Sequence, residues 1–204
     1  MMIRSVGAAA TFGLATASTL ISTVPEWNAV CMDLEDPAAW QIWRPLTGHL
    51  AHAGSQHLWL NVLTFCFLGV LRERQVGTRR FILEVAVLAL SVALGVRLLH
   101  NDWTSYRGLS GIVYGLVPLC LLGEQNRVGP AVVAILVGKS LLEWRLGGWL
   151  YERGSLETAL GVTYLPGSHV AGLVGGLLLV AVSARRPALS PQLPAIGGQP
   201  VAPG

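Results

Sequence analysis

Six long apolar blocks constrain the fold of this chain more than any other feature of its sequence. The blocks are Ser5–Val24, His57–Leu71, Phe81–Leu99, Gly108–Leu122, Val128–Leu146 and Val162–Ser183. A helix needs about 20 mostly apolar residues to span a bilayer, and most of the blocks approach that length. A buried soluble bundle is the alternative, but it would need polar helix faces, which these blocks lack. The sequence therefore predicts an all-α membrane protein with six transmembrane helices.

The arginines predict how these helices are oriented. If the N-terminus lies inside, the inside segments hold Arg4, Arg72, Arg74, Arg79, Arg80, Arg127, Arg185 and Arg186, and the outside segments hold Arg44, Arg107, Arg145 and Arg153. This bias follows the positive-inside rule and places both termini in the cytoplasm. The small net charge of +3 gives no indication of nucleic acid as a partner.

The ends and connections of the chain are less apolar. The first block could be a cleaved signal peptide, since Ala15–Ser18 contains small residues, but a retained anchor fits the arginine pattern better. Residues 1–186 are predicted to form the membrane domain, and the proline- and glycine-rich residues 187–204 a disordered cytoplasmic tail. The long outside connection Pro25–Gln56 carries tryptophans suited to the membrane interface, Trp27, Trp40 and Trp43.

Charges near the inner surface are expected to stay in water. Gly69–Arg80 is predicted to be a solvated charged turn, and Glu84 and Arg97 are expected to reach towards the membrane surface from the ends of the third helix. The three cysteines predict no disulfide, since Cys66 and Cys120 lie within apolar blocks and leave Cys31 alone outside.

The fourth block is too short to cross the hydrocarbon layer, and it begins with a serine between glycines. Its helix must start below the membrane surface, so the loop before Gly108 must dip into the bilayer. Irregular backbone at that depth is tolerated only beside protein or a water-filled cavity. The sequence therefore predicts a water-accessible pocket that opens to the outside, with Ser110 at its floor.

Other polar residues are expected at the same depth. His57 and Asn61 are four residues apart, so they share one face at the outer end of the second helix. His169 lies about two turns into the sixth block. A metal site formed by His49, His52 and His57 is an alternative. Their spacings of three and five residues and the lack of Asp or Glu among them make loop capping by His52 the preferred interpretation, with no metal.

Two pairs of glycines predict which helices touch. Gly111 and Gly115 form a small-xxx-small pair in the fourth block, and Gly172 and Gly176 form another in the sixth. Such pairs let two helix backbones approach closely. This crossing is expected to bring Ser110 within hydrogen-bond reach of His169.

These residue types suit nucleophilic catalysis. A serine hydroxyl becomes a good nucleophile when a neighbouring base takes its proton, and His169 is the candidate base for Ser110. Tyr114, one turn after Ser110, is placed to pack on the imidazole. The backbone N–H of Ser110 and the side chains of His57 and Asn61 are the candidate oxyanion donors.

Lys139 and Glu143 are charged residues within the fifth block. They are four residues apart and share one helix face. Charges inside a membrane span mark function by default, but an internal ion pair that allows both groups to be buried is the preferred interpretation. A role in substrate choice stays open.

The motifs together resemble those of the rhomboid intramembrane serine proteases, across Trp43–Ser183. The matching pieces are Trp43-Arg44, His57-x-x-x-Asn61, Gly108-Leu109-Ser110-Gly111 with Tyr114, and Ser168-His169-Val170-Ala171-Gly172 followed by Gly176. The resemblance implies that Ser110 is the nucleophile and His169 the base, that His57 and Asn61 help hold the oxyanion, and that no cofactor or metal is needed. Ser168 stands where many members carry alanine.

Within the family the compact core looks most like the rhombosortase branch. That resemblance implies a bilayer-embedded endopeptidase whose partner is a transmembrane substrate with a C-terminal Gly-Gly-type sorting helix. Two other classes stay open: an inactive rhomboid-like protein that escorts membrane helices, and a small transporter, although a transporter is expected to have paired broken helices. The sequence does not indicate the oligomeric state.

Overall fold

The computed structural model describes residues 7–24, 32–33, 43–52, 54–99, 105–122, 126–152 and 165–184. Its helices are α1 (Ala9–Thr23), α2 (Arg44–Thr47), the 3-10 helix η3 (Gly48–Leu50), α3 (Ser55–Val76), α4 (Thr78–Leu99), α5 (Ser110–Leu121), α6 (Gly129–Glu152) and α8 (Pro166–Ala184). Two-residue strands β1 (Met32–Asp33) and β2 (Ser105–Tyr106) pair in antiparallel fashion. Apart from this short pairing, the described chain is helical, as the sequence predicted.

Each predicted apolar block overlaps one of the longer helices: α1, α3, α4, α5, α6 and α8 in chain order. The fourth, α5, has 12 residues, so the prediction of a short helix after Gly108 is confirmed. By length and apolar composition alone, α4 and α8 are long enough to cross a membrane, and the bent pair of α2–η3 and α3 would make a third span among the described residues. The count of six spans stays a prediction.

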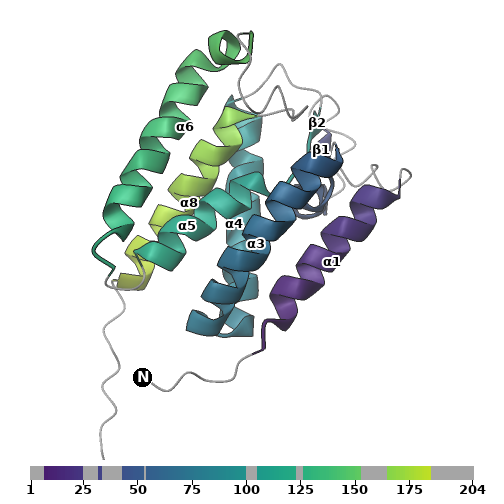
Figure 1. Ribbon diagram of the computed structural model, residues 1–204, viewed down its shortest axis with the longest axis vertical. Helices are drawn as coiled ribbons and strands as arrows, with labels where there is room; N and C mark the ends of the chain where they lie inside the picture. Colours follow the sequence, from purple (N-terminus) through teal and green to yellow (C-terminus); the bar gives the residue numbers. More distant parts are fainter. Residues whose placement is uncertain are drawn as a thin grey trace, which may run out of the picture.

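Helix α5 lies at the centre of the bundle. It packs against α8, α3, α4 and α6. Figure 1 shows it as a short helix between α8 and α3, with α6 along one edge and α1 along the other. Leu109, directly before this helix, and Leu116 and Leu119 within it are almost fully buried, so the core forms around α5.

The outside of the bundle is apolar. Large side chains with more than half of their surface exposed include Leu63, Phe67, Leu94, Leu98, Ile135 and Leu178. Soluble monomers rarely expose apolar surface on this scale, because its contact with water costs free energy. The alternative of a soluble bundle is therefore wrong, and the chain is an integral, multi-pass membrane protein.

The connection between α3 and α4 differs from its prediction. The sequence predicted a solvated charged turn over Gly69–Arg80, but α3 continues to Val76, and a single residue, Gly77, separates it from α4. Gly77 has a φ of 85°, which favours glycine. Arg72 and Glu73 are 5% and 0% exposed, because each of them finds partners inside the bundle.

Arg72 reaches Glu84 through two hydrogen bonds. Its Nε donates to Oε2 at 2.7 Å and its Nη2 donates to Oε1 at 2.8 Å, while its Nη1 donates to the carbonyl of Leu119 at 2.9 Å. A buried charge needs this kind of compensation. The expectation that Glu84 reaches towards the membrane surface is therefore wrong, since it lies 4% exposed between Arg72 and Arg80.

Glu73 ties α1 to the turn. Its carboxylate accepts hydrogen bonds from the backbone N–H groups of Ala10 and Thr11, at 3.2 and 2.9 Å, and from the hydroxyls of Thr11 and Thr78, at 2.7 and 2.8 Å. The N–H groups in the first turn of a helix have no acceptor within that helix, so a carboxylate is a favourable partner.

Several predictions fall outside the described residues. They concern Trp27 and Trp40 at the membrane interface, Cys31, and the tail 187–204. Trp43 is described, and half of its surface is exposed just before α2.

Candidate active site

The start of α5 is built on a glycine that no other residue could replace without strain. Gly108 has a φ of 125°, which side chains rarely adopt. A Cβ at this position would lie 2.9 Å from Cε1 of His57 and 3.9 Å from Nδ2 of Asn61. The backbone two residues before Ser110 therefore rests directly on the α3 face that carries both polar side chains.

The close contact of α5 and α8 confirms that the two glycine pairs bring these helices together, whereas the hydrogen bond between Ser110 and His169 stays a prediction. A Cβ on Gly172 would overlap the carbonyl of Gly111, and one on Gly176 would overlap the carbonyl of Gly115. A Cβ on Gly111 would in turn lie 2.9 Å from the carbonyl of Ser168, the residue before His169. The two backbones are therefore in direct contact next to Ser110 and His169.

Tyr114 packs on the imidazole of His169, as the sequence predicted. The two rings are stacked, with centroids 3.8 Å apart and planes 13° from parallel. His169 is 4% exposed in α8. Ser110, the first residue of α5, lies one turn before Tyr114 and is partly exposed.

His57 and Asn61 lie on α3 with 9% and 7% of their surface exposed. Within the part of the chain that the structure describes, Nδ1 of His57 and Nδ2 of Asn61 have no hydrogen-bond partner. A buried donor without a partner costs free energy, so the amide of Asn61 is a candidate hydrogen-bond donor to a ligand. Together with Ser110 of α5 and His169 of α8, the side chains of His57 and Asn61 form one polar cluster in an apolar bundle.

Comparison with known proteins identifies the family of this site. The Rhomboid domain matches residues 39–186, which include every predicted site residue. The chain belongs to the rhomboid family. The Rhomboid protease GlpG of Salmonella choleraesuis (strain SC-B67) is 29% identical over 144 residues, and that of Salmonella newport (strain SL254) is 28% identical over the same length. Each match covers 70% of this chain and 49% of the relative, so this chain spans about half the length of the curated relatives it matches.

His52 supports the loop that leads to Ser110 in this rhomboid domain. The backbone N–H of Leu109 donates to its Nε2 at 3.4 Å, which makes Nδ1 the protonated nitrogen, 3.3 Å from the carbonyl of Leu50. The hydroxyls of Ser18 and Ser22 on α1 lie 3.4 and 3.3 Å from Nδ1. The predicted loop capping by His52 is confirmed, and it extends to the residue before Ser110.

Burial keeps the two loop histidines neutral. Desolvation lowers the pKa of His49 to about 4. Desolvation, with a smaller contribution from His57, lowers the pKa of His52 to about 3. Among the described residues there is no group of three or more histidine, cysteine or acidic side chains that could hold a metal.

Tyr106 is a site residue that sequence reasoning missed. It is 4% exposed in β2, and its hydroxyl donates to the carbonyl of Gly108 at 2.9 Å. Burial raises the pKa of its phenol, while hydrogen bonding with Ser168, with the Gly111 backbone and with Ser110 opposes that rise. The Tyr106 hydroxyl therefore lies among groups of both α5 and α8. The available signal was a tyrosine four residues before Ser110. It was missed because a residue in a loop has no helical period from which to infer its position.

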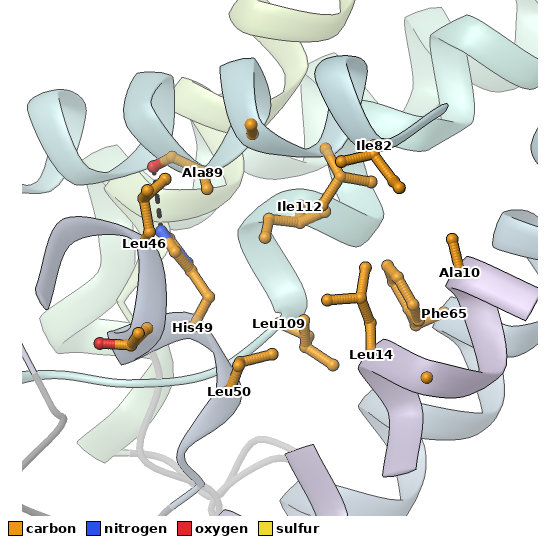
Figure 2. Close-up of a pocket in the computed structure, with 14 residues that line it drawn as sticks. Ala10, Leu14, Leu46, His49, Leu50, Phe65, Ile82, Ala89, Leu109 and Ile112 are labelled. Carbon is orange, nitrogen blue, oxygen red and sulfur yellow. Dashed lines mark hydrogen bonds between the residues drawn. The ribbon is translucent and has the colours of Figure 1, made fainter. Parts of the chain in front are cut away.

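The bundle also contains an apolar cavity of about 450 Å³. Figure 2 shows its walls, which include Leu14 of α1, Leu50 of η3, Ile82 of α4 and Ile112 of α5. None of Ser110, His169, His57 and Asn61 lines it. Among the described residues that line it, His49 is the one titratable side chain, and its Nε2 lies 2.9 Å from the carbonyl oxygen of Ala89.

Proposed function

We propose that this chain is an intramembrane serine endopeptidase with Ser110 as nucleophile and His169 as base. The observation that carries the proposal is the glycine-lined crossing of α5 and α8, with Tyr114 stacked on His169 one turn after Ser110. This crossing holds a hydroxyl and an imidazole from distant parts of the chain at one place in an apolar bundle. Membership of the rhomboid family supports the same conclusion.

The chemistry proceeds in two halves. The Oγ of Ser110 attacks the carbonyl carbon of the scissile peptide while an imidazole nitrogen of His169 takes the hydroxyl proton. The C–N bond then breaks, and His169 returns the proton to the leaving amine. Water, activated by the same imidazole, hydrolyses the acyl-enzyme and regenerates Ser110. No metal or cofactor takes part.

The negative charge that forms on the carbonyl oxygen needs donors that are already in place. The amide of Asn61 lies beside Gly108 without a partner among the described residues, and the ring of His57 touches the same glycine position. The N–H of Ser110 lies in the first turn of α5, where N–H groups have no acceptor within the helix. These three donors are the oxyanion hole of the proposal.

The substrate is a transmembrane protein cut near its outer, periplasmic end. The apolar outer surface of the bundle suits lateral contact with a substrate helix within the bilayer. The chain lies in a bacterial inner membrane, as its resemblance to the rhombosortase branch implies. Both termini are in the cytoplasm, as its arginine distribution predicts. A C-terminal Gly-Gly-type sorting helix is the preferred substrate class, supported by the resemblance to the rhombosortase branch.

Reconstitution in liposomes tests this function. Two single-span reporter peptides are compared, one with Gly-Gly at its outer end and one with Leu-Leu at the same place. Wild-type protein is expected to cut the Gly-Gly reporter near that end, as located by mass spectrometry, and Ser110→Ala is expected to cut neither. Equal cleavage of both reporters would contradict the sorting-helix preference, whereas binding without cleavage would favour the alternative of an inactive helix-binding protein.

A further inference from the structure

Lys139 of α6 joins a line of contacts that ends at the proposed base. Its Nζ is 2.5 Å from Oε1 of Glu143, one turn later in the same helix, which confirms the predicted ion pair. The expected burial of both groups is wrong, since 41% of the Lys139 side chain is exposed. The same Nζ donates to the hydroxyl of Tyr114 in α5 at 3.2 Å and lies 5.8 Å from the centre of the tyrosine ring. The same tyrosine ring stacks on the imidazole of His169.

We infer that Lys139, oriented by Glu143, is a positioning residue that holds Tyr114 parallel to the imidazole of His169. The inference rests on the proposed function and adds residues to it. An ion pair within one helix needs no third partner, because each charge already compensates the other. Lys139 nevertheless reaches across to a second helix, although 41% of its side chain is exposed and other orientations are open to it.

The surroundings of α6 explain why such a tether matters. Among its residues with described side chains, Gly129, Val133 and Ser140 are buried, and most of the others face outwards. Few buried residues mean that apolar packing fixes the position of this helix weakly. A hydrogen bond from a charged donor has a preferred length and direction, so it defines the tilt of the Tyr114 ring more closely than packing does.

Glu143 has two roles in this arrangement. It fixes the direction of the Lys139 side chain through the ion pair, and it neutralises a charge that lies near the base. During proton transfer the imidazole of His169 becomes positive, and an uncompensated ammonium nearby would oppose that charge. The pair therefore supplies a hydrogen-bond donor to Tyr114 without adding net charge beside His169.

The test measures how fast a fluorophosphonate probe labels the purified full-length protein in detergent, over a range of probe concentrations. The variants are Lys139→Met, Lys139→Arg, Tyr114→Phe and the double variant Lys139→Met/Tyr114→Phe. Arg80→Met is the matched control, because it removes another ion pair between residues four apart, with Glu84, at a different place in the bundle. Thermal unfolding of each variant shows that it is folded.

The inference predicts that Lys139→Met and Tyr114→Phe each lower the maximal labelling rate about three- to tenfold, with the half-saturating probe concentration unchanged. The double variant should be no slower than the slower single variant, because both remove the same hydrogen bond. Lys139→Arg should restore most of the rate, and Arg80→Met should label as the wild type does.

Two results would overturn the inference while leaving the proposed function intact: a wild-type rate in Lys139→Met, or a double variant whose loss is the product of the two single losses. A wild-type protein that is not labelled at Ser110 would contradict the proposed function itself, and this inference with it.

Discussion

Gly172 of α8 lies against the backbone carbonyl of Gly111 of α5, so closely that a Cβ on Gly172 would overlap the oxygen. The obstacle is backbone within a helix, which cannot turn away as a side chain can. The distance between the two helices is therefore set by the absence of side chains at these glycines. Since Ser110 precedes Gly111 and His169 lies one turn before Gly172, the same contact sets the geometry of the proposed dyad.

Gly172→Ala should damage both stability and activity. The added methyl group forces α8 away from α5 and moves His169 relative to Tyr114, at an expected cost of about 1–3 kcal/mol in the free energy of unfolding. Thermal unfolding and fluorophosphonate labelling measure the two effects. Gly138→Ala in α6 is the control, since nothing lies within 4 Å of its Cβ position. Equal behaviour of the two variants would show that the crossing does not determine the site.

Asn61→Ala should slow turnover without abolishing it. Removal of one oxyanion donor typically costs about 2.7–4 kcal/mol of transition-state stabilisation, which is roughly a hundred- to a thousandfold in rate. His57→Ala should have an effect of the same kind, whereas Ser110→Ala should abolish turnover. Cleavage of a reporter peptide measures all three, with Thr64→Ala as a control on the exposed side of α3. Equal residual activity in all three site variants would contradict the roles assigned here.

Acid should destabilise the fold through the loop histidines. The pKa of His49 is lowered to about 4 and that of His52 to about 3, from an ordinary value of 6.5. Below pH 6.5 the unfolded chain therefore binds protons that the folded chain does not, so stability is complete above that pH and falls towards pH 4. Thermal unfolding between pH 7.5 and 4.5 should show a smaller decrease in the His49→Gln/His52→Gln variant. An unchanged pH dependence would refute this account.

The buried pair of Arg72 and Glu84 should show strong coupling. Loss of either partner leaves a buried charge with less compensation, so Arg72→Met or Glu84→Met should cost about 3–5 kcal/mol in the free energy of unfolding. The double variant Arg72→Met/Glu84→Met should cost less than the sum of the two. Arg80 is 46% exposed, so its replacement by methionine should cost no more than about 1 kcal/mol. Additive single losses would contradict the coupling.

The sequence alone predicted the parts of the site that depend on short-range patterns. The glycine pairs predicted the α5–α8 crossing, because small residues four apart leave a groove on one helix face. The position of Tyr114 one turn after Ser110 predicted its contact with His169, and the spacing of Lys139 and Glu143 predicted their ion pair. Each of these inferences needs only the period of a helix.

Contacts between distant segments were not predictable in the same way. The sequence does not show that Glu73 meets the start of α1, or that Arg72 meets Glu84, because a charge at a helix end can either reach water or be paired inside. The hydrogen bond from Leu109 to His52 and the place of Tyr106 depend on how the loops fold back over α5. Loop conformation has no sequence period from which to infer it.

The most direct test of the central claim is to find where a fluorophosphonate probe attaches. The purified wild-type protein, Ser110→Ala and His169→Ala would each be treated with the probe, and the adduct would be located by peptide mass spectrometry. The account predicts one adduct, on Ser110, in the wild type and in neither variant. A folded wild-type protein that carries no adduct, or one whose adduct persists in Ser110→Ala, would contradict it.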